Sequence, residues 1–305
     1  MRRASAAELV DWGSDVLVAA GLRPDDARTV ADSLADAELR GTASHGFVRL
    51  ATYLERIVDG GINAGHTPSL LWDLGALASL DGDAGPGAAT AVHAVGLAVE
   101  RAREFGIGCV IVNNANHFGA AAFYSELIAD GGMIGIVSCN TDRAVCAPGG
   151  GAAMLGTNPL AIALPLAAAA RPILDMATSE VSYGKILVAA ADEQAIPLGW
   201  AVDATGSPTT SASEALHGSL LPAAGPKGFG LSFMIDALVA FGGASTSPFV
   251  APLHGPSGSA SCSSPCGHRS TWLRASTRRS STSRPSCGRA DCRRRRCSIR
   301  GSRNS

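Results

Sequence analysis

Residues 113–165 read NNANHFGAAAFYSELIADGGMIGIVSCNTDRAVCAPGGGAAMLGTNPLAIALP, and the rest of the predicted fold is arranged around them. Within this stretch His117 follows a strongly apolar segment, and glycine-rich turns stand at 148–151 and 155–159. An ionisable imidazole between glycine turns and buried strands is suited to binding a small polar ligand. The stretch therefore predicts a ligand site that includes His117.

The apolar pattern around this stretch predicts alternating strands and helices. Residues 106–112 and 133–138 are short continuous apolar runs, which are typical of buried strands. Residues 90–105 and 120–130 have apolar side chains at helical spacing. His117 then lies between a strand end and a helix start, where α/β proteins usually place ligand contacts. We therefore predict an α/β fold.

The segment before this region predicts helices. In residues 4–41 two helices are indicated, the first opened by the capping pair Ser5 and Glu8, the second by Pro24. Their apolar positions recur at helical spacing, which indicates packing and not chemistry.

A polar turn at Ser44-His45-Gly46 follows, and it predicts the start of a third helix. On that helix His45, Arg49 and Tyr53 would share one side, four residues apart. The planar guanidinium of Arg49 suits a substrate carboxylate, because it donates two parallel hydrogen bonds. The alternative is an Arg49 paired with an acidic residue on a solvated face.

Composition indicates a soluble globular protein of about two domains. The chain has 305 residues, of which 46% are hydrophobic and 17% are charged. We expect a cytoplasmic protein without a membrane span, because the first residues lead into acidic positions and no apolar run is long enough to cross a bilayer.

Several common nucleotide and hydrolase motifs are missing. The chain has no Walker A spacing, no G-x-G-x-x-G opening a βαβ unit and no G-x-S-x-G elbow, so a Rossmann site is unsupported. Gly225-Pro226-Lys227-Gly228 leads into an apolar helix at 231–241. A glycine turn with a lysine before a helix suits a phosphate, although surface lysines in such turns are also common.

Residues 247–305 differ in character from the rest. They hold twelve Arg and one acid, a net charge of about +11, whereas residues 1–246 carry about −12. One interpretation is a disordered basic arm that binds nucleic acid. Another, which we favour, is a GC-rich gene read in a shifted frame. The tail residues Cys262, Cys266, His268, Cys287, Cys292 and Cys297 have spacings that suit zinc, but no turn chemistry or apolar periodicity frames a metal domain there, so we predict no metal.

Taken together, the motifs resemble the malate/L-lactate dehydrogenase family, an NAD(P)-dependent group that includes ureidoglycolate and sulfolactate dehydrogenases and a cyclic imine reductase. The resemblance rests on motifs that occur in this order along the chain: Ser44-His45-Gly46-x-x-Arg49, Asn116-His117-Phe118-Gly119, Leu155-Gly156-Thr157-Asn158-Pro159, Asp175-Met176-Ala177-Thr178-Ser179 with Gly184-Lys185-Ile186, Ile196-Pro197-x-Gly199-Trp200-Ala201 and Gly225-Pro226-Lys227-Gly228.

The resemblance implies roles for individual residues. His117 would exchange a proton with a small 2-hydroxy or 2-oxo acid, while the nicotinamide of NAD or NADP exchanges a hydride. Arg49 would bind the substrate carboxylate, with His45 and Ser44 lining the same pocket. The cofactor would be contacted by Thr141, Asp175, Met176, Ala177 and Lys227.

Other readings of these residues stay open when each is taken singly. His117 also fits a helix-capping or satisfied core histidine, and Lys227 fits a surface lysine. Asp175 also fits a turn cap bonded to Thr178 and Ser179.

The resemblance also implies an architecture unrelated to Rossmann domains. Residues 1–70 would form an N-terminal helical part, residues 71–246 an NAD(P)-binding and catalytic α/β region on a mixed sheet, and residues 247–305 an aberrant tail. Relatives form dimers with sites near subunit contacts, and they continue into C-terminal helices that complete the helical part. This sequence departs from them from about residue 247. The alternative function is therefore an inactive remnant of such an enzyme, or nucleic-acid binding through the tail.

Overall fold

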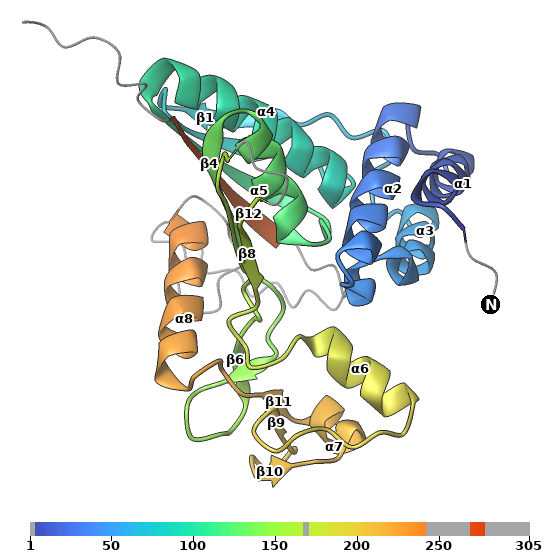
Figure 1. Ribbon diagram of the computed structural model, residues 1–305, viewed down its shortest axis with the longest axis vertical. Helices are drawn as coiled ribbons and strands as arrows, with labels where there is room; N and C mark the ends of the chain where they lie inside the picture. Colours follow the sequence, from blue (N-terminus) through green and yellow to red (C-terminus); the bar gives the residue numbers. More distant parts are fainter. Residues whose placement is uncertain (1–3, 167–170, 242–268, 278–305) are drawn as a thin grey trace, which may run out of the picture.

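The computed structural model describes residues 4–166, 171–241 and 269–277 (Figure 1). In these residues a helical part lies beside a large sheet, and a lobe with a smaller sheet lies at the opposite end. The helices are α1 (Ala6–Ala19), α2 (Pro24–Leu39), α3 (Leu50–Val58), α4 (Gly87–Phe105), α5 (Ala121–Asp130), α6 (Tyr183–Ala191), α7 (Ala212–His217) and α8 (Pro226–Phe241).

The larger sheet is mixed, as the resemblance implies. Its order is β1-β2-β3-β12-β4-β7-β8, in which β2 and β3 are parallel and the other neighbours are antiparallel. A Rossmann sheet is mostly parallel, so the expectation of a different fold is confirmed. The strands are β1 (Ser69–Asp73), β2 (Leu77–Asp81), β3 (Ile107–Ala115), β12 (Arg269–Thr277), β4 (Met133–Cys139), β7 (Leu160–Ala163) and β8 (Ile173–Met176).

The smaller sheet belongs to the second lobe and has five short strands. Its order is β10-β9-β11-β5-β6, and α6 and α7 pack beside it around a separate apolar cluster that includes Val145, Ile186 and Leu220. The strands are β5 (Val145–Cys146), β6 (Ala153–Leu155), β9 (Ala201–Val202), β10 (Pro208–Thr209) and β11 (Ser219–Leu220).

Most predicted elements are confirmed. The two helices in residues 4–41, the helices at 90–105 and 120–130 and the strands at 106–112 and 133–138 appear as α1, α2, α4, α5, β3 and β4. The predicted capping box at Ser5 and Glu8 is present at the start of α1. The apolar helix after Lys227 begins earlier than predicted, because Pro226 occupies the first position of α8, where a missing N–H costs nothing.

The single helix predicted to carry His45, Arg49 and Tyr53 is wrong. The chain forms two 3₁₀ turns, Ala43–His45 and Phe47–Arg49, before α3 begins at Leu50. Between the two turns Gly46 is extended, with φ −86° and ψ −152°. The Glu38 carboxylate accepts a 2.9 Å hydrogen bond from the Phe47 N–H, and a Cβ on Gly46 would lie 2.1 Å from that carboxylate oxygen. A contact with α2 therefore overrides the local helical spacing.

The strand β12 also differs from the sequence analysis, which places all of 247–305 in a tail. Its nine residues lie between β3 and β4 and pair antiparallel with both. Without it, two buried strands would face each other with unpaired N–H and C=O groups. Pairing with distant strands therefore decides the conformation of 269–277, where the local pattern predicts none. The tail cysteines named above lie outside the described residues.

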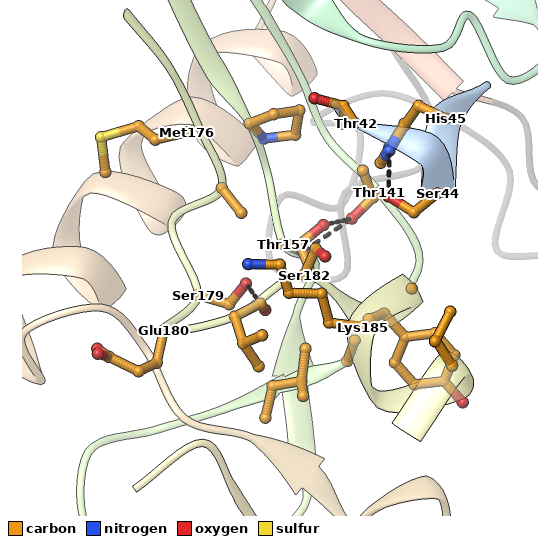
Figure 2. Close-up of a pocket in the computed structure, with 18 of the residues that line it drawn as sticks. Thr42, Ser44, His45, Thr141, Thr157, Met176, Ser179, Glu180, Ser182 and Lys185 are labelled. Atoms are coloured by element: carbon orange, nitrogen blue, oxygen red, sulfur yellow. Dashed lines mark hydrogen bonds between the residues drawn. The ribbon is translucent and has the colours of Figure 1, made fainter. Parts of the chain in front are cut away.

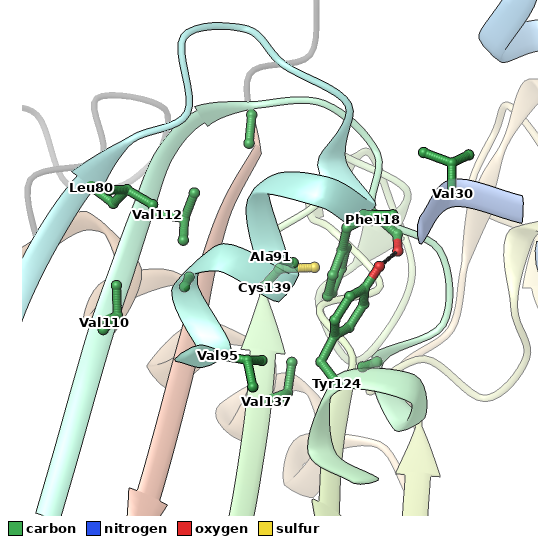
Figure 3. Close-up of a cluster of buried hydrophobic side chains, with 14 of the residues drawn as sticks. Val30, Leu80, Ala91, Val95, Val110, Val112, Phe118, Tyr124, Val137 and Cys139 are labelled. Atoms are coloured by element: carbon green, nitrogen blue, oxygen red, sulfur yellow. Dashed lines mark hydrogen bonds between the residues drawn. The ribbon is translucent and has the colours of Figure 1, made fainter. Parts of the chain in front are cut away.

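Small side chains allow the helices to approach the large sheet closely. On β3, a Cβ at Gly108 would lie 2.0 Å from the Ala98 carbonyl oxygen of α4, and on β4 a Cβ at Gly135 would lie 2.2 Å from the Ser125 carbonyl oxygen of α5. The face of α4 toward the sheet consists largely of buried alanines: Ala91, Ala94, Ala98 and Ala102. Figure 3 shows this core, with apolar side chains of the helices over those of the strands.

His66 is a buried titratable group in the packing of the helical part. It is 1% exposed, and its ring lies 3.3 Å from the Arg23 guanidinium and 3.9 Å from the Asp26 carboxylate. Burial lowers the pKa of His66 below its ordinary value; the Asp26 charge opposes this effect, and the Arg23 charge adds to it.

We expect His66 to make the folded state sensitive to mild acid. A histidine whose pKa is lowered by folding binds protons more readily in the unfolded state. Its contribution to the unfolding free energy is therefore complete above about pH 6.5, the ordinary pKa, and is lost as pH falls through the pKa of the folded state. Urea denaturation between about pH 7 and pH 5 should therefore show a smaller decline of the unfolding free energy in His66→Gln than in the wild type. His217→Gln, at an exposed position of α7, is the matched control. Equal declines in the wild type and His66→Gln would contradict the expectation.

Candidate active site

An open cleft of about 1600 Å³ contains most of the predicted site residues. Its walls include the loops after β3 and β4, the end of β8, the turn at 42–45 and the first turn of α6. Figure 2 shows side chains from these segments converging, with His45 above Thr141 and Thr157, Ser44 level with Thr141, and Lys185 extending from α6 toward Ser179. The cleft exceeds the roughly 300–1,000 Å³ of pockets for single small molecules. Its size thus suits a dinucleotide together with a substrate.

His117 lies in the loop between β3 and α5, at one end of the cleft. Its Nδ1 is 2.6 Å from the Tyr53 hydroxyl and receives a longer hydrogen bond, 3.3 Å, from the Gly119 N–H. Its ring stacks on that of His45, with centroids 5.7 Å apart and an interplanar angle of 26°. The structure thus brings together the two histidines that the sequence analysis selected.

The backbone of the His117 loop is held by the glycine turn before α4. The Asn116 amide group donates to the Ala84 carbonyl oxygen at 2.6 Å and to the Gly85 carbonyl oxygen at 3.2 Å. A Cβ on Gly87 would lie 2.2 Å from the Asn116 carbonyl oxygen and 2.4 Å from that of His117. Glycine at 87 is therefore required for the observed position of the loop.

Ser44, His45 and Arg49 form one side of the cleft. The Ser44 hydroxyl is 3.0 Å from His45 Nδ1, and Arg49 Nε donates a 2.7 Å hydrogen bond to the Ser44 carbonyl oxygen. Arg49 thus contacts a backbone carbonyl, not the acidic partner of the alternative reading. The first turn of α6 packs on this turn, since a Cβ at Gly184 would lie 2.8 Å from Ser44 Cβ.

The L-G-T-N-P motif holds Thr141 in the cleft. The Thr141 hydroxyl accepts a 2.8 Å hydrogen bond from the Thr157 N–H, and the Thr141 N–H donates to the Asn158 side chain at 2.9 Å. Asn158, fully buried, also donates to the Ser232 carbonyl oxygen of α8 at 3.0 Å. The motif is therefore a bridge between a cleft loop and α8.

Asp175, Met176 and Ala177 also line the cleft, at the end of β8. The Asp175 carboxylate accepts a 3.0 Å hydrogen bond from the Ala122 N–H in the first turn of α5. Asp175 keeps solvent-exposed surface, yet the surrounding protein displaces water from the carboxyl group and raises its pKa, against the lowering effect of the Ala122 N–H. Thr178 and Ser179 bond elsewhere, to the carbonyl oxygens of Thr157 and Val181, so the turn-cap reading of Asp175 is not what the structure shows.

Lys227 stands apart from the other predicted residues. It is exposed in the first turn of α8 and is not among the residues that line the cleft, although Ala223 shortly before it is. Its contact with a cofactor phosphate stays a prediction.

Two further residues belong to the site by position. Lys185 lines the cleft, and Tyr53 contacts His117. Both belong to sequence features described above, Lys185 to the Gly-Lys-Ile motif and Tyr53 to the predicted helix face, but neither was predicted as a site residue.

Among the described residues there is no cluster of three or more His, Cys, Asp or Glu that could hold a metal ion.

We expect Gly87→Ala to displace His117. The added Cβ meets two backbone carbonyls, so the loop must shift, and overpacking of this kind costs about 1–3 kcal/mol of stability. Gly96→Ala is the matched control on the same helix, because nothing lies within 4 Å of its new Cβ; it should stabilise α4 by about 0.5–1 kcal/mol. Thermal denaturation measures both changes. A Gly87→Ala protein as stable as Gly96→Ala would show that the loop does not depend on Gly87.

Comparison with known proteins places these residues in a family. A model of the malate/L-lactate dehydrogenase family matches residues 4–277. L-sulfolactate dehydrogenase of Methanocaldococcus jannaschii is 43% identical over 230 residues, covering 75% of this chain and 67% of that enzyme. For ureidoglycolate dehydrogenase (NAD(+)) of Escherichia coli strain K12 the identity is 40% over 222 residues, covering 73% and 63%. The chain thus spans about two thirds of the length of these relatives.

The fold agrees with solved structures of the same group. Malate dehydrogenase from Pyrococcus horikoshii OT3 superposes with a TM-score of 0.77 at 33% identity, covering 90% of this chain and 75% of that one. Sulfolactate dehydrogenase from Methanocaldococcus jannaschii superposes with a TM-score of 0.78 at 37% identity, covering 90% and 77%. By sequence and by fold, the chain belongs to the malate/L-lactate dehydrogenase family.

Proposed function

We propose that this protein is an NAD(P)-dependent dehydrogenase that interconverts a small 2-hydroxy acid and its 2-oxo acid. The observation that carries the proposal is the stacked pair His45 and His117 beside Arg49, in a cleft large enough for a dinucleotide and a substrate. The relatives support it, since their names specify sulfolactate, malate and ureidoglycolate as substrates.

Each side chain has a distinct task in this proposal. Arg49 binds the substrate carboxylate through its guanidinium, which its Nε bond to Ser44 orients. His117 gives a proton to the carbonyl oxygen in reduction and removes it from the hydroxyl in oxidation. His45 and Ser44 complete the wall of the substrate pocket. When bound, the nicotinamide supplies or accepts the hydride.

In this proposal the cofactor is bound by cleft residues from the loop after β4 and the end of β8. Thr141 and Asp175–Ala177 offer a hydroxyl, a carboxylate and apolar surface to NAD or NADP, and Lys227 offers a charge for a phosphate from the first turn of α8. Relatives carry names with either NAD(+) or NADP(+), so both cofactors belong to the test.

The remaining expectations concern the whole molecule. No helix in the described part of the chain could cross a membrane. We propose a homodimer, as the family resemblance implies, and a cytoplasmic location, as the sequence analysis above predicts from the first residues and the short apolar runs. Nucleic acid is not a proposed partner, because the composition of residues 247–305 favours a shifted reading frame over a basic arm. The Arg cluster at 293–296 lies outside the described residues.

The test is oxidation of NADH and NADPH by the purified protein with oxaloacetate, pyruvate and 3-sulfopyruvate. We expect turnover with at least one pair, and a fall in kcat of at least about 100-fold in His117→Asn. No turnover with any pair would favour the inactive remnant. Undiminished turnover in His117→Asn would refute the assignment of the proton donor.

We expect Arg49→Lys to separate binding from chemistry. Lysine keeps the charge but loses the planar fork, so KM for the 2-oxo acid should rise by about tenfold while kcat changes less. Arg28→Lys, on the exposed face of α2 where Arg28 pairs with Asp11, is the matched control. Steady-state kinetics measure both variants. An unchanged KM in Arg49→Lys would remove Arg49 from the carboxylate site.

A further inference from the structure

We propose that Tyr53 is a positioning residue that keeps a proton on Nδ1 of His117, so that Nε2 is the nitrogen that exchanges a proton with the substrate. This inference rests on the proposed function, because it assigns an atom to the proton transfer. It concerns a side chain that the sequence analysis noted only as sharing a helix face with His45 and Arg49.

The geometry brings the phenol to one nitrogen of the imidazole. The Tyr53 hydroxyl is 2.6 Å from His117 Nδ1, and the two ring centroids are 5.9 Å apart. Tyr53 is 7% exposed and belongs to the main apolar core, so its ring is fixed by packing from α3. At this distance the Tyr53 hydroxyl and His117 Nδ1 form a hydrogen bond, in which the phenol oxygen can accept when Nδ1 carries a proton.

The proton balance requires Nδ1 to remain protonated. In reduction an imidazolium breaks its Nε2–H bond, the carbonyl oxygen gains that proton while the carbonyl carbon gains the hydride that a bound nicotinamide would supply, and the electron pair of the broken bond stays on Nε2. The ring is then neutral and still carries Nδ1–H. In oxidation the hydroxyl proton returns to the Nε2 lone pair. A neutral ring with its proton on Nε2 has no lone pair there and cannot act as this base.

Among the described residues, the Gly119 N–H and the Tyr53 hydroxyl both lie within hydrogen-bond distance of Nδ1 and favour different states of it. The Gly119 N–H, 3.3 Å away, can only donate, and it favours a lone pair on Nδ1. The Tyr53 hydroxyl is closer and can accept, so it can hold the Nδ1 proton, and Nδ1 in that state no longer accepts from the Gly119 N–H. A phenylalanine at 53 would fill the same space but lack the hydroxyl that accepts from Nδ1–H. The Gly119 N–H would then favour a lone pair on Nδ1 without competition from Tyr53. The proton would then move to Nε2.

The test is the tautomer of His117 in the unliganded, ¹⁵N-labelled protein. Long-range ¹H–¹⁵N correlation spectra at about pH 8.5, where histidines are neutral, distinguish a protonated Nδ1 from a protonated Nε2. His117→Asn identifies the signals. We expect Nδ1–H in the wild type and Nε2–H in Tyr53→Phe, with kcat for hydroxy-acid oxidation reduced at least about tenfold and KM changed less than about twofold.

Tyr124→Phe is the matched control. It removes a buried hydroxyl that donates to the carbonyl of Phe118, the residue next to His117, without touching the imidazole. We expect its His117 tautomer to match the wild type. A change in Tyr124→Phe equal to that in Tyr53→Phe would mean that the tautomer reports general loosening of the loop, and would overturn the proposal.

The remaining outcomes are also decisive. Nε2–H in the wild type, or the same tautomer in the wild type and Tyr53→Phe, would overturn the proposal. If Tyr53→Phe fails to fold, Nε2–H in the wild-type spectrum still overturns the proposal and Nδ1–H supports it. The spectra need neither cofactor nor substrate, so a protein without turnover would defeat the proposed function and leave the assignment of Nδ1 readable.

Discussion

The close seating of the His117 loop on Gly87 is the constraint on which the site depends. The carbonyls of Asn116 and His117 occupy the space that a side chain at 87 would need, and the Asn116 amide bonds the turn before α4. The loop therefore cannot move away from α4 without losing buried hydrogen bonds. Because α4 is itself seated closely on β3 at Gly108, the imidazole is fixed relative to the sheet. A rigid position of this kind would suit the proton transfer that we propose for His117.

The cleft lies between two lobes whose described residues form separate apolar clusters. Asn158 connects the Thr141 loop to α8, and within the large-sheet part Asp175 accepts from the first turn of α5. Across the cleft, Gly184 lets α6 approach Ser44. Each lobe has its own apolar cluster, so the space between them is left to side chains that can bind a polar ligand. The raised pKa of Asp175 is a consequence of placing a carboxylate against this partly closed surface.

Local pattern predicted most of the fold, because helices and buried strands are set by the spacing of apolar side chains within a few residues. It failed where a distant contact competes. Glu38 of α2 bonds the backbone of Phe47 and breaks the predicted helix at Gly46. Residues 269–277, whose own sequence has no strand pattern, form a strand because they pair with the edges of both β3 and β4. In both cases the deciding hydrogen bonds join residues that the sequence separates.

The sequence by itself determined the family and the mixed α/β class, and it selected most of the residues that line the cleft, because motifs such as Asn116-His117-Phe118-Gly119 are chemical signatures that need no coordinates. Only the tertiary structure decided which groups meet. It placed Tyr53 on Nδ1 of His117 from 64 positions away, and it left Lys227 outside the cleft lining. Spacing along a helix predicts which side chains share a face, but the partner of a buried hydroxyl depends on how whole elements pack, and that packing is set by contacts between distant parts of the chain.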